Sequence, residues 1–332
     1  MDIFNELVSH YFELQPEAFR PVPFGLTNHS RIVDINNRSY IARIYDKSTK
    51  TIDRLRYEIE LTAFLTQQQL SFDVPFFLRT INDSTYVELS NGQLGVMMLF
   101  IEGAAPDLER LLDVEEYGRV VGEVSVALQA YLPSAQSSSH ISFNRVESLH
   151  PLANNNHVLQ FLSKPPFFIA QQKLDKIIEI MNELKHIQPK LDQLPKQVVH
   201  HDLLLFNLLI DPETRKMNGV LDFDFASYDV RALEPAICIT HLVQVNSQPL
   251  EAIAVFWSEY KRFMELTPVE IVYVPALIRL YYIALIYIYI GQAYSGREIE
   301  QYFLFIVDQL EHMEQWLGQH AHELESILKG EV

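Results

Sequence analysis

A block near the middle of the chain, residues 198–228, restricts the possible folds more than any other part of the sequence. It contains two short apolar segments, Leu208–Ile210 and Gly219–Leu221, separated by a polar turn at residues 211–213. Short apolar runs on both sides of a polar turn predict a β-hairpin. The polar residues around this hairpin are therefore the first candidates for chemistry.

Those polar residues have the order and spacing that phosphoryl transfer uses. His200 and Asp202 precede the first predicted strand, and Asn207 completes the pattern D-x-x-x-x-N. Asp222 stands at the end of the second strand. Phosphoryl transfer needs a group that orients the attacking hydroxyl, and oxygen ligands that hold Mg²⁺ against the nucleotide phosphates. Kinases take the first from an H-x-D-x-x-x-x-N loop and the metal carboxylate from an Asp after the next strand.

The same block resembles the aminoglycoside phosphotransferase family, which includes choline kinase and type II homoserine kinase. That family carries H-G-D-x-x-x-x-N and then I-D-F/W-D/E. The corresponding residues here are His200-His201-Asp202, Asn207 and Leu221-Asp222-Phe223-Asp224, and the match continues to Glu234, where relatives commonly have an Asp. The chain departs from the family at His201, which replaces a glycine, so that a side chain must be accommodated beside Asp202.

The resemblance implies an α+β, two-lobed protein-kinase-like fold. A small antiparallel β-rich N-lobe would take residues 1–101, and a larger, mainly helical C-lobe would take residues 102–332. By the same resemblance, Asp202 orients and deprotonates the acceptor hydroxyl, while Asn207 and Asp222 hold Mg²⁺.

The residues of this block can also be interpreted as structural rather than catalytic. A single Asp near a strand end is more often a turn or helix cap, but four residues in kinase register favour catalysis. His200 is expected to brace the loop rather than to accept a proton. Two roles stay open for Asp224, which could help to hold the metal or cap the next segment.

Arg43 is the candidate for phosphate binding in the N-terminal part. It lies in an apolar segment that follows a predicted turn at residues 36–37, and such a segment predicts a β-strand. Alternation along the strand places Arg43 on the same face as Ile41 and Tyr45, with Ala42 and Ile44 on the other face. By resemblance, Arg43 stands where protein kinases have the lysine that contacts the nucleotide phosphates, and a guanidinium group can bind phosphate bidentately.

A charge on a hydrophobic face needs a partner. The predicted helix at residues 52–69 offers Glu58 and Glu60 as partners for Arg43. Glu58 is favoured, because its distance from Leu65 matches the family's E…L helix, and Glu60 stays open.

Two further segments resemble nucleotide-binding parts of the family. The turn that contains Gly25, Thr27 and Asn28 resembles the family's G-x-x-N segment, and backbone N–H groups in such a turn can hold anionic oxygens. The chain is expected to cross between lobes at residues 100–103. The resemblance implies that backbone groups there, at Phe100 and Ile101, bond the adenine.

The C-terminal part predicts long helices at about 232–245, 249–265, 270–292 and 297–328, from apolar residues at helical spacing. Relatives build their substrate pockets in this part. Glu234 is expected either to position the catalytic loop or to meet a substrate amine, and Arg279 is a further candidate substrate contact.

Composition narrows the partners and the compartment. The formal net charge of −17 argues against nucleic acid and anionic membrane surfaces. The single cysteine, Cys238, is expected to be buried and suits a reducing cytoplasm. The first residues lack the basic and apolar regions of a signal peptide. The apolar run at 280–290 is expected to be too short to span a bilayer and to form a buried core helix.

Together these features predict an ATP- and Mg²⁺-dependent kinase that phosphorylates the hydroxyl of a small molecule, with amino alcohols among the candidates. Type II homoserine kinase is the branch it resembles most, and an aminoglycoside, choline or sugar acceptor stays open. A catalytically silent nucleotide-binding relative is the main alternative. A metal phosphohydrolase of the HD type is disfavoured, because its His-Asp pair lies on helices, whereas His201-Asp202 precedes a predicted strand.

Overall fold

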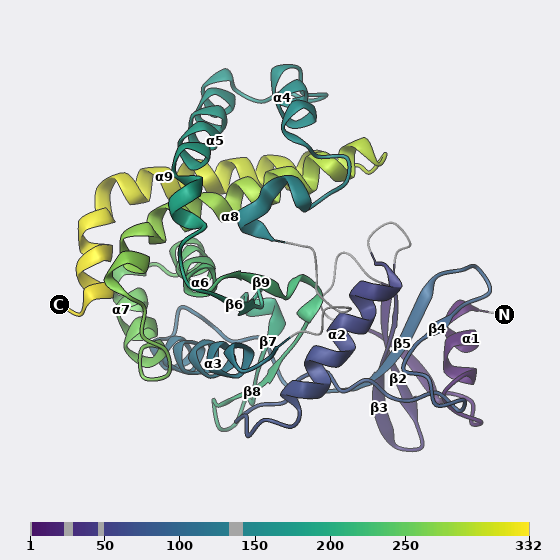
Figure 1. The fold of residues 1–332 in the computed structure, drawn as a ribbon. Helices are drawn as coiled ribbons and strands as arrows, with labels where there is room; N and C mark the ends of the chain where they lie inside the picture. The colour runs from purple at the N-terminus through teal and green to yellow at the C-terminus, as the bar shows by residue number, and fades with distance from the viewer. Residues whose placement is uncertain (1, 23–28, 46–49, 133–141, 332) are drawn as a thin grey trace. The chain divides into compact units, whose positions relative to one another are not determined.

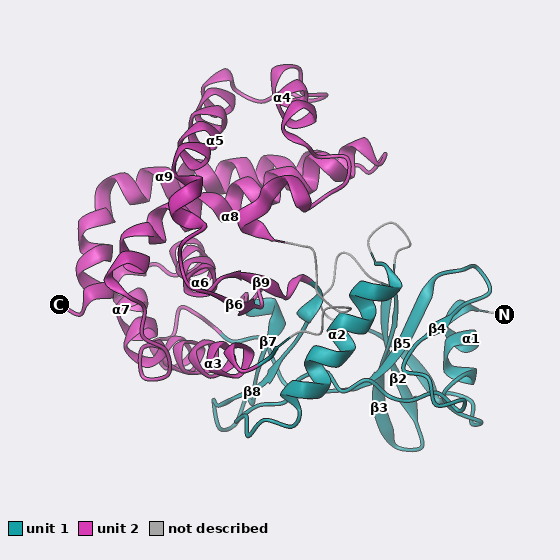
Figure 2. Cartoon of the chain, viewed as in Figure 1, with its two compact units in different colours: residues 1–106, 131–139, 205–224 teal, residues 107–130, 140–204, 225–332 magenta. Residues whose placement is uncertain are grey.

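The computed structural model of the 332-residue chain describes residues 2–22, 29–45, 50–132 and 142–331. The chain divides into two compact units (Figure 2). Unit 1 comprises residues 1–106, 131–139 and 205–224, and unit 2 comprises residues 107–130, 140–204 and 225–332. The lobe boundary expected between residues 101 and 102 stays a prediction, and the central hairpin groups with unit 1.

Unit 1 is built on a five-stranded antiparallel sheet with the strand order β1-β2-β3-β5-β4 (Figure 1). The predicted turn between β2 and β3 is confirmed, because Asn36 and Asn37 have φ angles of 51° and 59°. A two-residue hairpin turn needs this left-handed conformation, which asparagine tolerates. The strands are β1 (Ala18–Pro21), β2 (His29–Ile35), β3 (Arg38–Ile44), β4 (Val87–Glu88) and β5 (Leu94–Leu99).

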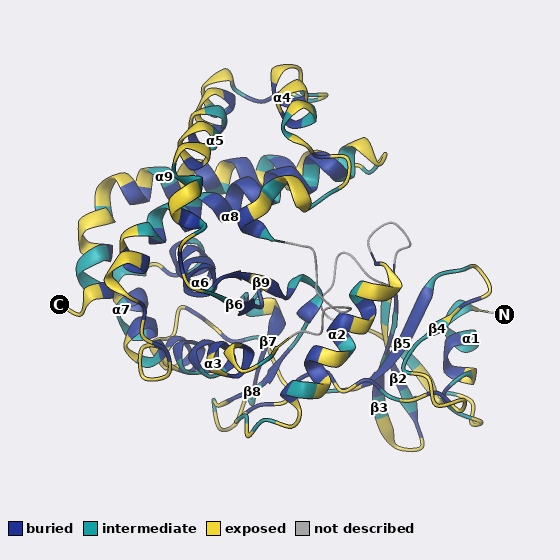
Figure 3. Cartoon of the chain, viewed as in Figure 1, coloured by how far each residue is buried: buried dark blue, intermediate teal, exposed yellow. Residues whose placement is uncertain are grey.

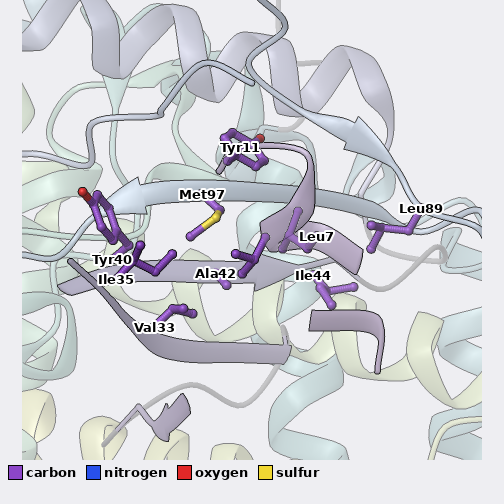
Figure 4. Close-up of a cluster of buried hydrophobic side chains, with 10 residues drawn as sticks. Leu7, Tyr11, Val33, Ile35, Tyr40, Ala42, Ile44, Leu89 and Met97 are labelled. Atoms are coloured by element: carbon purple, nitrogen blue, oxygen red, sulfur yellow. The ribbon is translucent and has the colours of Figure 1, made fainter. Parts of the chain in front are cut away.

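Apolar side chains leave β3 on both faces of this sheet. Ala42 and Ile44 pack in one cluster with Leu7 of helix α1 (Ile3–Ser9), as Figure 4 shows. Tyr45, just after the strand, packs in a second cluster with Leu55 of helix α2 (Ile52–Leu65). The predicted alternation along β3 is therefore confirmed, and Arg43 shares the face of Tyr45.

The predicted central hairpin is also confirmed. Strands β7 (Leu208–Ile210) and β8 (Met217–Val220) pair antiparallel. Asp211 shapes the turn, because its side chain accepts a hydrogen bond of 2.7 Å from the backbone N–H of Thr214. Within unit 1 the hairpin is bonded to the segment after β5, since Ile210 N donates to Ala104 O at 2.8 Å.

Unit 2 is mainly helical, and the four predicted C-terminal helices are confirmed. The short antiparallel sheet of β6 (Lys196–Val199) and β9 (Ser227–Val230) is absent from the prediction. The helices are α3 (Leu111–Gln129), α4 (Asn155–Ser163), α5 (Gln171–Leu191), α6 (Leu233–Val245), α7 (Pro249–Tyr260), α8 (Pro268–Tyr294) and α9 (Glu300–Lys329), with the 3-10 helix η1 (Phe143–Ser148).

Two helices of unit 2 approach so closely that one contact requires glycine. Gly118 of α3 faces the backbone of α7, where an added Cβ would overlap the carbonyl group of Phe256. Glycine therefore permits this backbone approach, which a larger residue would prevent. The tight α3–α7 contact forms part of the support for β6, since Gln197 of β6 donates from Nε2 to Ser125 O of α3 at 2.8 Å.

Helix α8 corrects one expectation. The apolar helix is longer than the expected run at 280–290, because α8 extends to both sides of Arg279 and has 27 residues in total. By length and composition alone, it could cross a membrane. Nevertheless, 61% of the most apolar 18-residue stretch of α8 is buried. Figure 3 shows buried residues along this helix, which packs against α6 and α9. The prediction of a buried core helix is confirmed.

Candidate active site

Asn207 and Asp222, the two predicted metal ligands, are brought together within unit 1 by the hairpin. Asn207 ends a 3-10 turn directly before β7, and Asp222 follows β8. Leu208 pairs with Val220 in the ladder, and Leu221 N extends it by donating to Asn207 O at 2.8 Å. Both residues therefore stand at the same end of the hairpin.

The Asp222 carboxylate keeps a ligand atom available. Its Oδ1 is buried and has no hydrogen-bond partner among the described residues, although Arg43 Nη1 lies 3.6 Å away. Asp222 also has a φ angle of 61°, a left-handed conformation that costs a non-glycine residue roughly 1 kcal/mol or more. Strain of this kind persists where the surroundings hold it, and binding sites are common examples.

This donor set fits Mg²⁺. Amide and carboxylate oxygens are the hard ligands that Mg²⁺ takes, and the ion keeps several waters and binds substrate phosphates rather than filling a closed protein cage. Across the described part of the chain, no group of three or more His, Cys, Asp or Glu side chains could hold a metal ion. The sparse pair of Asn207 and Asp222 is the kind of set that Mg²⁺ with a nucleotide would use.

The ion pair of Arg43 corrects another expectation. Sequence reasoning pairs Arg43 with Glu58, but the structure pairs Arg43 with Asp222 and places Lys50 Nζ 2.5 Å from Glu58 Oε2. Glu58 thus attracts Arg43 only over a longer distance, because the nearer lysine takes its carboxylate. Burial lowers the pKa of Arg43, but the surrounding carboxylates, with Asp222 the largest contributor, raise it by more. The pKa therefore lies above its ordinary value, and the guanidinium stays charged.

Lys50 is a buried cation shared by two carboxylates. Its Nζ lies 2.5 Å from Glu58 Oε2 and 2.5 Å from Asp224 Oδ1, and the residue is 5% exposed. Burial lowers the pKa of Lys50, but the carboxylates of Asp224 and Glu58 raise it above its ordinary value. Lys50 therefore ties helix α2 to the segment that follows Asp222.

Asp224 is engaged in the same cluster. Besides Lys50, Arg54 Nη2 lies 3.6 Å from Asp224 Oδ1. Burial raises the pKa of Asp224, but these cations, Lys50 foremost, lower it below its ordinary value. Of the two roles that the sequence leaves open, a structural role is favoured over metal binding.

Asp202 lies in unit 2, in the loop after β6 and near the point where the chain enters the last segment of unit 1. His200 braces this loop. It is completely buried. Its backbone N–H donates to Glu234 Oε2 at 2.6 Å, and its side-chain Nδ1 accepts from the backbone N–H of Asp202 at 3.2 Å. The bracing role expected for His200 is confirmed, and the Asp202 backbone is fixed by its neighbour.

Glu234 supports the loop from the first turn of α6. It is 1% exposed, and burial raises its pKa to about 7, although His201 and the backbone N–H groups of the loop act in the opposite direction. A carboxyl group that is buried and bonded to the loop favours positioning over direct contact with a substrate amine.

The remaining candidates are the residues expected to bind the nucleotide or the acceptor. Gly25, Thr27 and Asn28 lie outside the described residues. Phe100 N donates to Ser39 O at 3.4 Å, and both Phe100 and Ile101 are half-buried. Arg279 of α8 donates from Nε to Glu314 Oε1 of α9 at 2.6 Å. Their roles in adenine, phosphate or substrate binding stay predictions.

Sequence reasoning misses Lys50 and the surroundings of His201. A lysine just before a helix is indistinguishable in sequence from a solvated surface lysine, and no motif marks it. His201 does carry a signal, because a side chain in the place of the family's glycine must be packed somewhere. Its packing partners, Phe143 and Asp229, come from parts of the chain that contain no recognisable motif.

Comparisons with known proteins show which family the chain is similar to. A family model described as "Phosphotransferase enzyme family" matches residues 18–266. The homoserine kinase of Zymomonas mobilis is 26% identical over 243 residues, which cover 70% of this chain and 69% of that protein. A homoserine kinase of Rhodopseudomonas palustris is 25% identical over 228 residues, which cover 67% of this chain and 62% of that protein.

Solved structures show the fold. The microcompartment-associated aminopropanol kinase matches with a TM-score of 0.67 at 15% identity and covers 97% of both chains. An amicoumacin kinase in complex with AMP-PNP and Ca²⁺ matches with a TM-score of 0.68 at 14% identity and covers 92% of this chain and 91% of the other. The predicted α+β, two-lobed protein-kinase-like fold is confirmed.

Proposed function

Because the chain belongs to the phosphotransferase enzyme family and is a small-molecule kinase of that family, we propose that it transfers the γ-phosphoryl group of ATP to the hydroxyl of a small amino acid or amino alcohol. The joining of Asn207 and Asp222 at one end of the β7–β8 hairpin carries this proposal. Homoserine is the first candidate acceptor, because proteins named homoserine kinase match 67–70% of the chain. An aminoglycoside, choline or a sugar is the alternative within the same family.

Asn207 and Asp222 would hold Mg²⁺ through an amide oxygen and a carboxylate oxygen. When bound, the ion supplies positive charge that offsets the charge of the phosphate oxygens during transfer. Arg43 binds the nucleotide phosphates, and its attraction to Asp222 keeps its guanidinium near that carboxylate. Lys50 holds Glu58 and Asp224 and so fixes the segment that carries Asp222.

Asp202 orients the acceptor hydroxyl and accepts its proton as the oxygen attacks the γ-phosphorus. The loop bonds from His200 and Glu234 hold its backbone in place. Positioning and charge neutralisation supply most of the catalysis in this reaction class, because little covalent chemistry is left for the protein.

The reaction takes place in the cytoplasm, a placement supported by the buried, unpaired thiol of Cys238.

ADP release from Mg·ATP tests the proposal across a panel of homoserine, choline, an aminoglycoside, a sugar and methylthioribose. Homoserine should stimulate ADP release most. Asp202→Ala should abolish transfer and leave nucleotide affinity largely unchanged, because the base acts in the transition state. Asp222→Ala should weaken the binding of Mg·ATP itself, which calorimetry measures.

Asp211→Asn is the matched control, because Asp211 stands in the turn at the other end of the same hairpin and caps Thr214. This variant should keep both nucleotide affinity and turnover. Nucleotide binding without stimulation by any acceptor would favour the catalytically silent alternative. Full turnover by Asp202→Ala would remove Asp202 from its role.

A further inference from the structure

His201, the residue in the place of the family's glycine, is built into a stack of three rings within unit 2. Its ring lies 4.4 Å from that of Phe143 with an interplanar angle of 14°. The Phe143 ring lies 6.3 Å from that of Tyr281 at an angle of 13°. Three nearly parallel rings therefore connect the loop that carries Asp202 with helix α8.

One carboxylate, that of Asp229, lies close to two members of this stack. Asp229 is 1% exposed, and its Oδ2 accepts from Phe143 N at 2.6 Å. The same oxygen lies 3.3 Å from His201 Nε2, while His201 Nδ1 lies 3.1 Å from Phe225 O. A hydrogen bond to Asp229 thus fixes Phe143, and the contact of Nδ1 with Phe225 O fixes His201, in addition to the stacking.

The backbone at His201 shows that these contacts offset a cost. His201 has a φ angle of 67°, where glycine has no penalty and another residue loses about 1–2 kcal/mol. The imidazole is 1% exposed, so its packing and polar contacts must hold the loop in this conformation. The contact of Nδ1 with Phe225 O distinguishes His201 from a side chain that merely fills space.

Tyr281 is the ring at the far end of the stack, opposite His201. Tyr281 of α8 is 7% exposed. Burial and then the Asp202 carboxylate raise the pKa of Tyr281 well above its ordinary value. Burial, Tyr302 and Asp202 also raise the pKa of Tyr289, two turns further along α8. The stack thus joins Tyr281 to His201, the neighbour of Asp202 in the chain.

We propose that His201 and Phe143 are positioning residues that fix Asp202 relative to Tyr281, and that Tyr281 determines which acceptors are accepted. This inference rests on the proposed kinase function and assigns the acceptor side of the same site. A phenol ring at the end of this stack offers an acceptor both a flat apolar surface and a hydroxyl that can form a hydrogen bond. A displacement of about 1 Å of the base can cost on the order of 100-fold in rate.

Steady-state kinetics with homoserine and Mg·ATP test the positioning role. Phe143→Leu keeps apolar volume but removes the flat ring, and His201→Gly relieves the backbone strain but removes the ring. Each should lower kcat about tenfold or more and leave the KM for ATP within about twofold. His201→Phe keeps the stack and should retain more of kcat than His201→Gly. Phe305→Leu, at an exposed position of α9, is the control.

Two kinetic results would overturn the proposal. One is wild-type kcat in both Phe143→Leu and His201→Gly, and the other is a loss in His201→Phe equal to that in His201→Gly. For specificity, Tyr281→Leu should change the ratio of kcat/KM for homoserine and choline by about tenfold. An unchanged ratio would remove Tyr281 from acceptor selection.

A measurement without turnover separates this proposal from the proposed function. In protein labelled with ¹³Cζ-tyrosine, Tyr281→Phe identifies the Tyr281 resonance. Asp202→Asn should shift that resonance in the wild-type background and shift it at most half as much in the Phe143→Leu background. Equal shifts in both backgrounds would overturn the positioning role. An inactive wild-type protein would refute the kinase proposal, while the resonance shifts would still decide whether the stack couples Tyr281 to Asp202.

Discussion

Replacing Lys50 with methionine tests how unit 1 holds its buried charges. Lys50 Nζ lies 2.5 Å from one oxygen each of Glu58 and Asp224. At an effective dielectric constant of about 20, one pair of unit charges at this distance attracts by about 7 kcal/mol, and the loss of hydration offsets much of that. Removing one partner of a buried ion pair costs about 3–5 kcal/mol, because the remaining charge is left uncompensated. Lys50→Met should lower the free energy of unfolding by that amount.

A double variant checks the physical cause. Lys50→Met with Glu58→Gln removes one positive and one negative charge, and Asp224 still has Arg54 Nη2 at 3.6 Å. The double variant should therefore recover at least about 1–2 kcal/mol of the loss caused by Lys50→Met alone, as coupled neighbours do. Lys329→Met is the control, because the pair of Lys329 with Glu325 is exposed at the end of α9 and should contribute nothing measurable.

Urea unfolding at pH 7, followed by circular dichroism and tryptophan fluorescence, measures these differences. Because Asp224 lies two residues after Asp222, calorimetry should also show weaker binding of Mg·ADP to Lys50→Met. A loss of stability below about 1 kcal/mol, the range of surface pairs, together with additivity in the double variant, would refute the idea that Lys50 is a shared buried cation.

Three further predictions concern other parts of the chain. Burial raises the pKa of Glu234 to about 7, so this group stabilises the fold fully below about pH 4.5, and the contribution is lost as the pH rises through 7. The free energy of unfolding should therefore fall between pH 5 and pH 8, and Glu234→Gln should make this fall about 2–3 kcal/mol smaller. Urea unfolding at both pH values measures the fall, and an unchanged fall in the variant would contradict the prediction. Gly118→Ala should destabilise by about 1–3 kcal/mol through overlap with the carbonyl group of Phe256. By contrast, Gly318→Ala, with nothing within 4 Å of the added Cβ, should stabilise by up to about 1 kcal/mol, and equal melting temperatures of the two variants would contradict this. Arg43→Lys keeps the charge but loses the guanidinium fork and should raise the Kd for ADP about tenfold in calorimetry, whereas an unchanged Kd would remove Arg43 from phosphate binding.

Short-range patterns explain what could be predicted from the sequence. The β7–β8 hairpin follows from two apolar runs and a polar turn, and the two faces of β3 follow from strict alternation. The bracing role of His200 follows from its place in a motif. In each case the informative residues lie within one element or one motif, so they are close in the sequence and can be recognised together.

The missed features depend on contacts between distant residues. Lys50 and Asp224 are separated by 174 positions, and neither residue type reveals the other in a single sequence. The same holds for the ring of Phe143, which stacks on His201 from a segment without a motif. The prediction that Arg43 pairs with Glu58 is wrong for this reason. Glu58 pairs instead with Lys50, whose burial depends on tertiary packing.

The division of the chain also governs the order in which unit 1 can be completed during synthesis. Its sheet is encoded by the first 106 residues, but its hairpin at 205–224 is made only after much of unit 2. At about 5–20 residues per second, the 174 residues between Lys50 and Asp224 take on the order of 10–35 s. During this interval Lys50 and Glu58 lack their third charged partner. The first 106 residues are thus an unfinished folding unit, and a fragment cut at residue 106 should be less stable than the same residues in the full chain.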